Sequence, residues 1–315
     1  MTTIDLTDTN ASAVSAALVS ARRAAGNQAV GMVLTLIVVV DEATHYDALR
    51  SARDAGREHP SRILVVITRP GRGEPRLDAE IRVADGRPGD TVVLRLHGEL
   101  AKHADSVVLP LLLPDTPVVV WWPSKAPPVP GQDQLGVLAQ RRITDAAASL
   151  QPMRALHQRA DSYVPGDTDL AWTRLTPWRA LLAAALDQLP GSTVTAATVE
   201  AERGNPSAEV LASWLGGRLG VDVTRRESKG PGITLVRMTT TGAGERATAD
   251  DSEIVLSRPD GVLAQLDLPG GPVRPVALRR RETAELLTEE LRRLDPDEVY
   301  SAVIKDCARP EKESS

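Results

Sequence analysis

The alternation of apolar and polar positions divides the chain into two stretches with different periods. In the first stretch, segments with apolar residues at helical spacing alternate with short segments that are apolar throughout. The continuously apolar segments, each of strand length, are residues 30–40, 63–68 and 117–122. The helix-like segments between and around them are residues 10–25, 42–58 and 99–112. Helices alternating with fully buried strands predict a mostly parallel sheet with helices on both faces.

The rest of the first stretch is less regular. Residues 80–84 and 91–97 alternate in polarity and predict two further strands. A proline-rich loop at 123–132 leads into residues 135–148, which we expect to be helical. Thr176 followed by Pro177 is a good start signal for a helix that runs to Leu189. We therefore expect an N-terminal α/β domain over residues 1–190, ending at a Pro-Gly pair.

The second stretch, residues 191–307, reads as an α+β domain with an antiparallel sheet. Its clearest feature is a hairpin, because Pro259-Asp260-Gly261 supplies a turn between two alternating segments. The other expected strands are residues 193–202, 221–227 and 232–241, and the expected helices are residues 206–219, 282–294 and 296–304. The charged tail, residues 308–315, is expected to be disordered.

Composition narrows the choice of partners and compartment. The formal net charge is −5, which disfavours binding to the phosphate backbone of a nucleic acid. Cys307 is the only cysteine, so no disulfide can form within the chain, which fits a reducing cytoplasm. The longest apolar run, residues 30–40, is shorter than the ~20 residues that a membrane helix needs. It also lacks the flanks of a signal peptide, so we expect a cytoplasmic protein without a membrane segment.

No familiar catalytic or cofactor motif occurs in the sequence. It contains neither a phosphate-binding P-loop nor a dinucleotide-binding glycine fingerprint, a nucleophile elbow or a zinc-binding H-E-x-x-H. None of the five histidines stands at metal-ligand spacing from another His or from Cys. The sequence therefore predicts no catalytic residues, no metal and no bound cofactor.

Two clusters of basic residues are candidates for binding an anion. Arg95 and His97 close a predicted strand and Lys102 follows one turn later, at the sheet edge where ligands of open α/β sheets bind. A sugar phosphate or carboxylate could bind there, although a solvated strand-to-helix turn is the simpler interpretation. Arg279, Arg280 and Arg281 precede a helix and could also hold an anion, but local pairing with Glu282 and Glu285 is simpler.

Aromatic side chains are scarce, because the chain has no Phe, three Tyr and five Trp, so each Trp stands out as an anchor. Trp121 and Trp122 are adjacent on a predicted strand and must point to opposite faces of the sheet. They lie at the end of that strand, where helices often stop covering a sheet. We therefore expect one of the two to be only partly buried.

A second aromatic group lies in the segment Asp169-Leu-Ala-Trp-Thr-Arg-Leu-Thr-Pro-Trp-Arg179. Interleaved Trp, Arg, Asp and Thr is typical of a protein-binding surface, because it combines rigid aromatic area with bidentate donors. The alternative is a structural corner in which Asp169 and Arg174 pair around buried indoles. The residue pattern does not decide between the two. If it is an interface, we expect Trp172, Arg174, Trp178 and Arg179 to contact the partner, with Asp169 orienting an arginine and Trp121 and Trp122 forming a second patch.

The same segment resembles the signature of the OpcA family, the glucose-6-phosphate dehydrogenase assembly proteins. Further matching motifs follow in order along the chain: His59-Pro-Ser-Arg-Ile63, Leu109-Pro-Leu-Leu-Leu-Pro-Asp-Thr-Pro-Val-Val-Val-Trp-Trp-Pro123 and Leu294-Asp-Pro-Asp-Glu-Val-Tyr300. The resemblance implies a non-enzymatic partner that binds glucose-6-phosphate dehydrogenase and promotes its active oligomer or activates it. It would thereby support NADPH production in the oxidative pentose phosphate pathway.

One feature departs from the family. Some of its members in photosynthetic organisms are linked to thioredoxin control through cysteines, whereas this chain has only Cys307. A disulfide switch within one chain is thereby excluded. The alternative to the partner role is an α/β protein that binds or processes a sugar phosphate, with Arg95, His97 and Lys102 at the strand ends.

Overall fold

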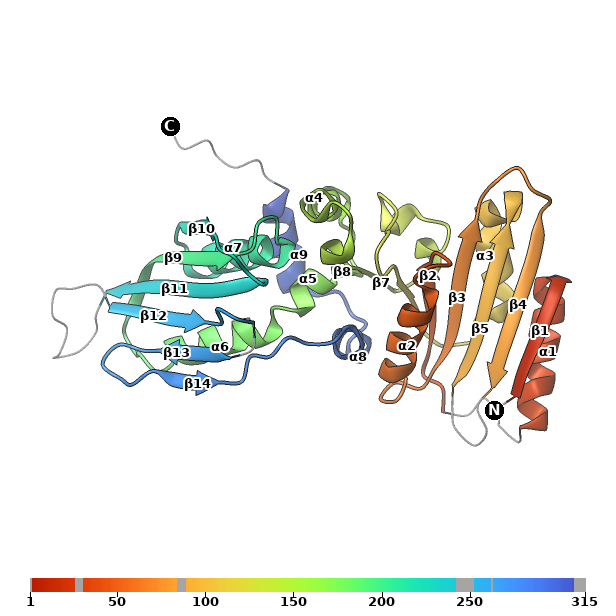
Figure 1. Cartoon of the computed structure of the whole chain (residues 1–315), viewed down its shortest axis with the longest axis horizontal. Helices are drawn as coiled ribbons and strands as arrows, with labels where there is room; N and C mark the ends of the chain where they lie inside the picture. The colour runs from red at the N-terminus through yellow and green to blue at the C-terminus, as the bar shows by residue number, and fades with distance from the viewer. Residues whose placement is uncertain (1, 26–30, 84–88, 242–251, 262, 309–315) are drawn as a thin grey trace. The chain divides into compact units, whose positions relative to one another are not determined.

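The computed structural model describes residues 2–25, 31–83, 89–241, 252–261 and 263–308 (Figure 1). The chain divides into two compact units that are interleaved along the sequence. The first unit comprises Met1–Ala148, Val164–Thr168 and Glu282–Asp297, and the second comprises Ser149–Tyr163, Asp169–Arg281 and Glu298–Ser315. This division differs from the single boundary expected at residue 190.

The first unit is built on an eight-stranded sheet with the order β1-β4-β5-β3-β2-β6-β7-β8. The strands are β1 (Thr2–Thr9), β2 (Leu34–Val40), β3 (Ser61–Arg69), β4 (Arg76–Val83), β5 (Asp90–His97), β6 (Val118–Trp121), β7 (Arg141–Thr144) and β8 (Asp167–Asp169). The helices of this unit are α1 (Ala11–Ala24), α2 (His45–Ala55), α3 (Ala104–Val108) and α8 (Thr283–Arg292). Strands β5, β3, β2, β6 and β7 run parallel, β4 pairs antiparallel with β5, and β1 pairs antiparallel with β4. The predicted α/β class with a mostly parallel sheet is confirmed.

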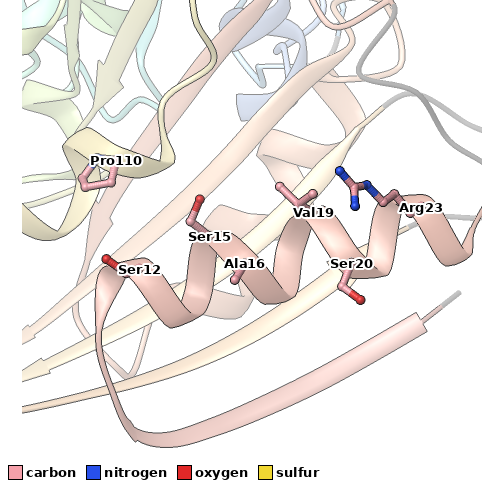
Figure 2. Close-up of a pocket in the computed structure, with 7 residues that line it drawn as sticks. All are labelled: Ser12, Ser15, Ala16, Val19, Ser20, Arg23 and Pro110. Atoms are coloured by element: carbon pink, nitrogen blue, oxygen red, sulfur yellow. The ribbon is translucent and has the colours of Figure 1, made fainter.

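Helix α1 covers the sheet with the apolar face that the helical spacing of its sequence predicts. Asn10 begins the helix, because its side chain accepts a hydrogen bond from the backbone N–H of Ala13 at 3.0 Å. Val14, Leu18 and Ala21 form the buried face of the helix. The outward face, with Ser12, Ser15, Ala16, Val19, Ser20 and Arg23, borders a surface hollow beside Pro110 (Figure 2).

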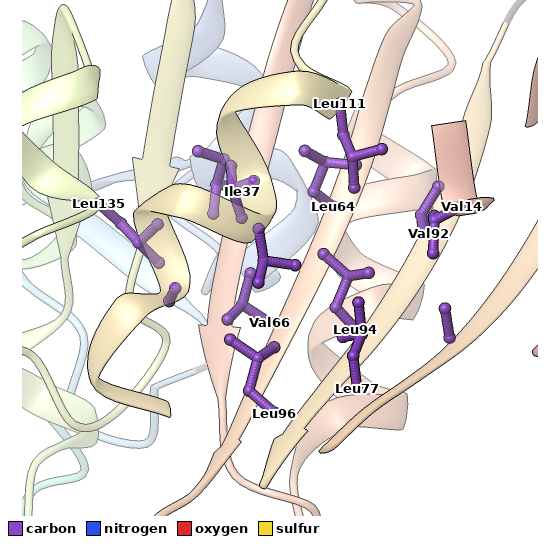
Figure 3. Packing of buried hydrophobic residues seen from close by; sticks show 14 of the residues in the cluster. Val14, Ile37, Leu64, Val66, Leu77, Val92, Leu94, Leu96, Leu111 and Leu135 are labelled. Atoms are coloured by element: carbon purple, nitrogen blue, oxygen red, sulfur yellow. The ribbon is translucent and has the colours of Figure 1, made fainter. Parts of the chain in front are cut away.

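The main core of the first unit lies between the sheet and the layer that contains α1 and α3 (Figure 3). Branched aliphatic side chains of β2, β3 and β5, such as Ile37, Leu64 and Leu94, form its centre and are fully buried. Helix α2 contacts β2 and β3 and packs against α8. Both faces of the central strands are therefore covered, which explains why those strands are apolar throughout.

The expected helix over residues 135–148 is wrong. The segment forms a short 3-10 turn at Gly136–Leu138 and then strand β7, which extends the sheet beside β6. Arg141 and Arg142 are buried in β7 because each forms an ion pair with a carboxylate elsewhere in the unit. The polarity pattern could not reveal this strand, since pairing rather than hydrophobicity places its side chains inside.

The expected continuous helix over residues 99–112 is also broken. The chain forms a 3-10 turn at Gly98–His103, the short helix α3 and a second 3-10 turn at Leu109–Leu111. Pro110 lies within this last turn, where a proline cannot donate the backbone hydrogen bond of a continuing α-helix.

The second unit contains a six-stranded sheet with the order β10-β9-β11-β12-β13-β14. These strands are β9 (Thr193–Ala201), β10 (Val223–Glu227), β11 (Ile233–Thr241), β12 (Ser252–Ser257), β13 (Ala264–Asp267) and β14 (Arg274–Val276). The helices are α4 (Pro152–Ser162), α5 (Leu170–Thr173), α6 (Thr176–Leu186), α7 (Pro206–Leu219) and α9 (Glu298–Cys307). Only β10 and β9 are parallel, so the expected α+β domain with an antiparallel sheet is confirmed.

The segment boundaries in this unit follow local sequence signals. Helix α7 has the expected bounds, because Asn205 accepts a hydrogen bond from the N–H of Ala208 and Gly220 ends the helix in the left-handed region. The expected hairpin is present, with Val255 opposite Asp267 in β12 and β13. Of the tail expected to be disordered, residues 309–315 lie outside the described residues.

Candidate functional site

The carboxyl edge of the parallel strands carries a network of ion pairs. Glu42 follows β2, Arg69 ends β3 and Arg95 lies near the end of β5, so the topology brings all three to one edge. Arg69 Nη2 lies 2.7 Å from Glu42 Oε2, and Arg95 Nε lies 3.2 Å from Glu42 Oε1. Burial raises the pKa of Glu42, but hydrogen bonds from Arg69 and Arg95 outweigh it and hold that pKa below its usual value.

The other predicted members of this site also lie close to carboxylates. His97 Nε2 is 3.1 Å from Asp78 Oδ2 on the neighbouring strand β4. Lys102 Nζ is 2.9 Å from Glu99 Oε2 at an exposed position. Asp78 also accepts a hydrogen bond from the backbone N–H of Asp8. The structure therefore brings Arg95 and His97 to one edge but places each of the three basic residues beside a carboxylate, the arrangement expected for the solvated-turn alternative.

The turn after β5 depends on a glycine. Gly98 has φ +59°, and a Cβ there would lie 2.3 Å from the backbone oxygen of Gly73. No other residue type fits this close approach without moving the backbone. The glycine thus fixes how the chain leaves the strand that carries Arg95 and His97.

The two adjacent indoles at the end of β6 are both buried. Trp121 is 1% exposed and Trp122 is 2% exposed, so the expectation that one is partly buried is wrong. Strand β7 continues the sheet beyond β6, and the backbone N–H of Trp122 donates to the carbonyl oxygen of Ile143 at the end of β7. The sequence interpretation placed a helix where β7 lies. It therefore did not predict that a further strand would lie beside the end of β6 and bury both indoles.

The predicted patch at residues 169–179 forms a packed corner in the second unit. Asp169 is buried and caps α5 by accepting a hydrogen bond from the N–H of Ala171 at 2.9 Å. Trp172 is buried against Tyr300 of α9, with ring centroids 5.9 Å apart. The guanidinium carbon of Arg179 lies 3.5 Å from the centroid of the Trp172 ring, a cation–π contact within one segment.

Trp178 faces a different neighbour from Trp172. It is buried in the first turn of α6, and the guanidinium carbon of Arg258 lies 5.2 Å from its ring centroid. The residue at the N-cap of α6 is Leu175, and the hydroxyl of Thr176, the first residue of the helix, accepts a hydrogen bond from Arg179. Within the predicted partner-binding set, Arg174 and Arg179 are the two residues that are only half-buried. The indoles shape this corner, and the two arginines are the groups that reach its surface.

Two buried ion pairs in the first unit were missed by the sequence interpretation. Arg141 Nε lies 3.2 Å from Glu290 Oε2, a carboxylate of α8, and Arg141 also donates to the carbonyl oxygen of Asp295. Arg142 pairs with Asp167 and donates to the carbonyl oxygens of Ala139 and Pro165. Only the long-range pairing distinguishes these arginines from surface ones, so no local signal could have identified them.

Two surface hollows lie within single units. One, of about 560 Å³, lies between the outward face of α1 and Pro110 in the first unit (Figure 2). The other, of about 360 Å³, lies between α7 and α9 in the second unit and includes Trp214, which is half-buried, unlike the other four tryptophans. Neither hollow includes a candidate partner-binding or ligand-binding residue predicted from the sequence.

The described residues contain no group of three or more His, Cys, Asp and Glu side chains that could hold a metal ion. Cys307 is a free, buried thiol, and burial raises its pKa to about 11. Within the ranges that the structure describes, no helix is long and apolar enough to cross a membrane.

These features define an α/β protein of two interleaved units, one with a mostly parallel sheet and one with a mostly antiparallel sheet. Residues 52–161 match the family model described as the glucose-6-phosphate dehydrogenase subunit N-terminal domain, and residues 165–304 match the corresponding C-terminal domain. The chain belongs to the OpcA family of glucose-6-phosphate dehydrogenase assembly proteins. The resemblance carried by the sequence motifs is thereby confirmed. A comparison with curated proteins found no match.

Several solved structures of oxidoreductases are similar to the chain at low level. A 3-ketoreductase from Actinomadura kijaniata, in complex with TDP-benzene and NADP, is 9% identical over 88% of this chain and 95% of that chain, with a TM-score of 0.42. An oxidoreductase from Sinorhizobium meliloti is 12% identical over 86% of each chain, with a TM-score of 0.38. Similarity this low carries no argument about the chemistry of the present chain.

Proposed function

We propose that this chain binds a glucose-6-phosphate dehydrogenase and activates it, or promotes its active oligomer, without catalysing a reaction itself. The observation that carries this proposal is the match of both family domains, in order, from residue 52 to residue 304. Through its partner, the chain would support NADPH production in the oxidative pentose phosphate pathway. A single cysteine fits the reducing cytoplasm, where we place the protein.

Within the predicted partner-binding set, we propose that Arg174 and Arg179 contact the dehydrogenase. Both side chains are half-buried at the corner that the buried Trp172, Trp178 and Asp169 form, and the Arg179 guanidinium lies on the Trp172 ring. Arginine fixed by a rigid aromatic base is a frequent anchor of protein interfaces, because little side-chain entropy remains to be lost on binding. In this arrangement Trp172 and Trp178 stabilise the fold and do not contact the dehydrogenase. The same holds for Trp121 and Trp122.

The test combines the purified chain with the dehydrogenase from the same organism. We expect a saturable rise in the rate of NADPH formation and co-elution of the two proteins on size exclusion with light scattering. Arg174→Ala should weaken the apparent affinity about tenfold, the loss of one interface anchor. Arg50→Ala, which removes an exposed arginine of the first unit, should leave it unchanged.

The outcomes separate the general proposal from the residue assignment. No complex and no rate change, with both proteins folded, would refute the partner role. A complex of wild-type strength with Arg174→Ala would leave the partner role standing and remove Arg174 from the interface.

A further inference from the structure

A buried arginine lies at the end of β12 in the second unit. Arg258 is 6% exposed, and its Nη1 donates to the carbonyl oxygen of Leu278 at 2.7 Å. Its Nε is buried without a hydrogen-bond partner in the described part of the chain. The face of Trp178 lies on one side of the guanidinium. Burying a guanidinium whose N–H groups lack hydrogen-bond acceptors costs free energy, unless an acceptor binds to them.

A second guanidinium lies next to Arg258. A Cβ placed on Gly232 would lie 2.8 Å from Arg280 Nη2 and 4.0 Å from Arg258 Nη2. Both Nη2 atoms therefore lie next to Gly232. Arg280 is exposed, whereas Arg258 and Gly232 are buried, so solvent meets this pair of arginines at Arg280. Gly232 has φ +68°, and any side chain there would collide with Arg280.

The charges around these two arginines are not balanced by direct pairing. Neither Arg258 nor Arg280 forms an ion pair with a carboxylate among the residues that the structure describes. Burial and the neighbouring Arg280 lower the pKa of the Arg258 guanidinium, and the charge of Asp260 opposes this by raising it. A second carboxylate, Glu202, lies against Gly230 in the adjoining turn, with Oε2 3.0 Å from a Cβ placed there.

We propose that Arg258 and Arg280 together bind the phosphate group of a small molecule next to Gly232. Two guanidinium groups offer several N–H donors to the oxygens of one dianion and balance its two charges. Because position 232 has no side chain, the Arg280 guanidinium lies beside that of Arg258. Arg280, the middle residue of the Arg279–Arg281 run, thus contributes to anion binding together with Arg258, which is distant in sequence. This site is independent of the partner role proposed above.

The experiment uses the full chain and inorganic phosphate as the probe. Calorimetric titration and thermal unfolding, with chloride at matched ionic strength as reference, should show saturable phosphate binding and a rise in Tm. Arg280→Gln should weaken phosphate binding tenfold or more while leaving the fold intact, because Arg280 is exposed. Arg279→Gln is the matched control, since it removes the same charge from the adjacent exposed residue.

Three results would overturn the site: no saturable binding of phosphate, equal effects of phosphate and chloride, or equal binding by the Arg280→Gln and Arg279→Gln proteins. Glycerol phosphate provides the second arm of the titration. Binding of the ester that is also lost in Arg280→Gln supports a phosphorylated metabolite as the ligand. Binding of inorganic phosphate alone supports the site with the free ion as its ligand.

Discussion

At the scale of single residues, burial decides which of the distinctive side chains can meet a partner. Composition drew attention to the tryptophans, yet four of the five are buried and Trp214 alone is half-buried. The sequence could identify them as anchors, because a chain without Phe has few other large side chains. It could not say whether they anchor a core or an interface, since both environments favour the same residue.

Cys307 gives a prediction at this scale. Its thiol is 7% exposed, and burial raises its pKa to about 11, so little reactive thiolate is present near neutral pH. We expect labelling by a disulfide reagent at pH 8 to be about 100-fold slower in the native protein than in urea, since the pKa rises by about two units. Fast stoichiometric labelling of the native protein would contradict this and reopen redox control through Cys307.

At the scale of elements, the apolar strands β2 and β3 and the more polar strands β5, β9, β10 and β11 were predicted, whereas β1 and β7 were not. The central strands β2 and β3 and the helix α7 lie close to where the pattern places them. Strand β7 was predicted as part of a helix, because Arg141 and Arg142 are buried only through partners far away in sequence. The sequence singled out Arg280 within the Arg279–Arg281 run but not Arg258, because the two are brought together by turns at Gly232 and Gly261, which no local pattern specifies.

The turn that ends β5 gives a prediction about an element. Gly98→Ala should destabilise the protein by about 2 kcal/mol or more, because a Cβ at positive φ would collide with the Gly73 carbonyl. Gly71→Ala is the control, since a Cβ at Gly71 would meet nothing within 4 Å. Urea denaturation followed by circular dichroism measures both changes. Equal midpoints for the two variants would show that the turn adjusts without cost.

At the scale of the whole molecule, the two units do not follow one another along the chain. Helix α8 belongs to the first unit although it follows the strands of the second, and it packs against α2. Its Glu290 pairs with the buried Arg141 of β7. A fragment cut at the expected boundary of residue 190 would lose this helix and leave Arg141 buried without its carboxylate, a loss of about 3–5 kcal/mol.

We therefore expect the fragment of residues 1–190 to unfold without a cooperative transition. A matched chain in which residues 1–168 are joined to residues 282–297 by a flexible linker should regain one. Thermal unfolding followed by circular dichroism distinguishes the two. A sharp transition in the 1–190 fragment alone would show that the first unit does not need α8.

The late position of α8 also has a consequence during translation. A ribosome completes residues 1–148 early, but the helix that covers α2 is not synthesised until about 150 residues later. At typical elongation rates that interval lasts on the order of ten seconds, during which the nascent first unit exposes apolar surface. This protein should accordingly depend on a chaperone that holds nascent chains more than a protein of equal length whose domains are continuous in sequence.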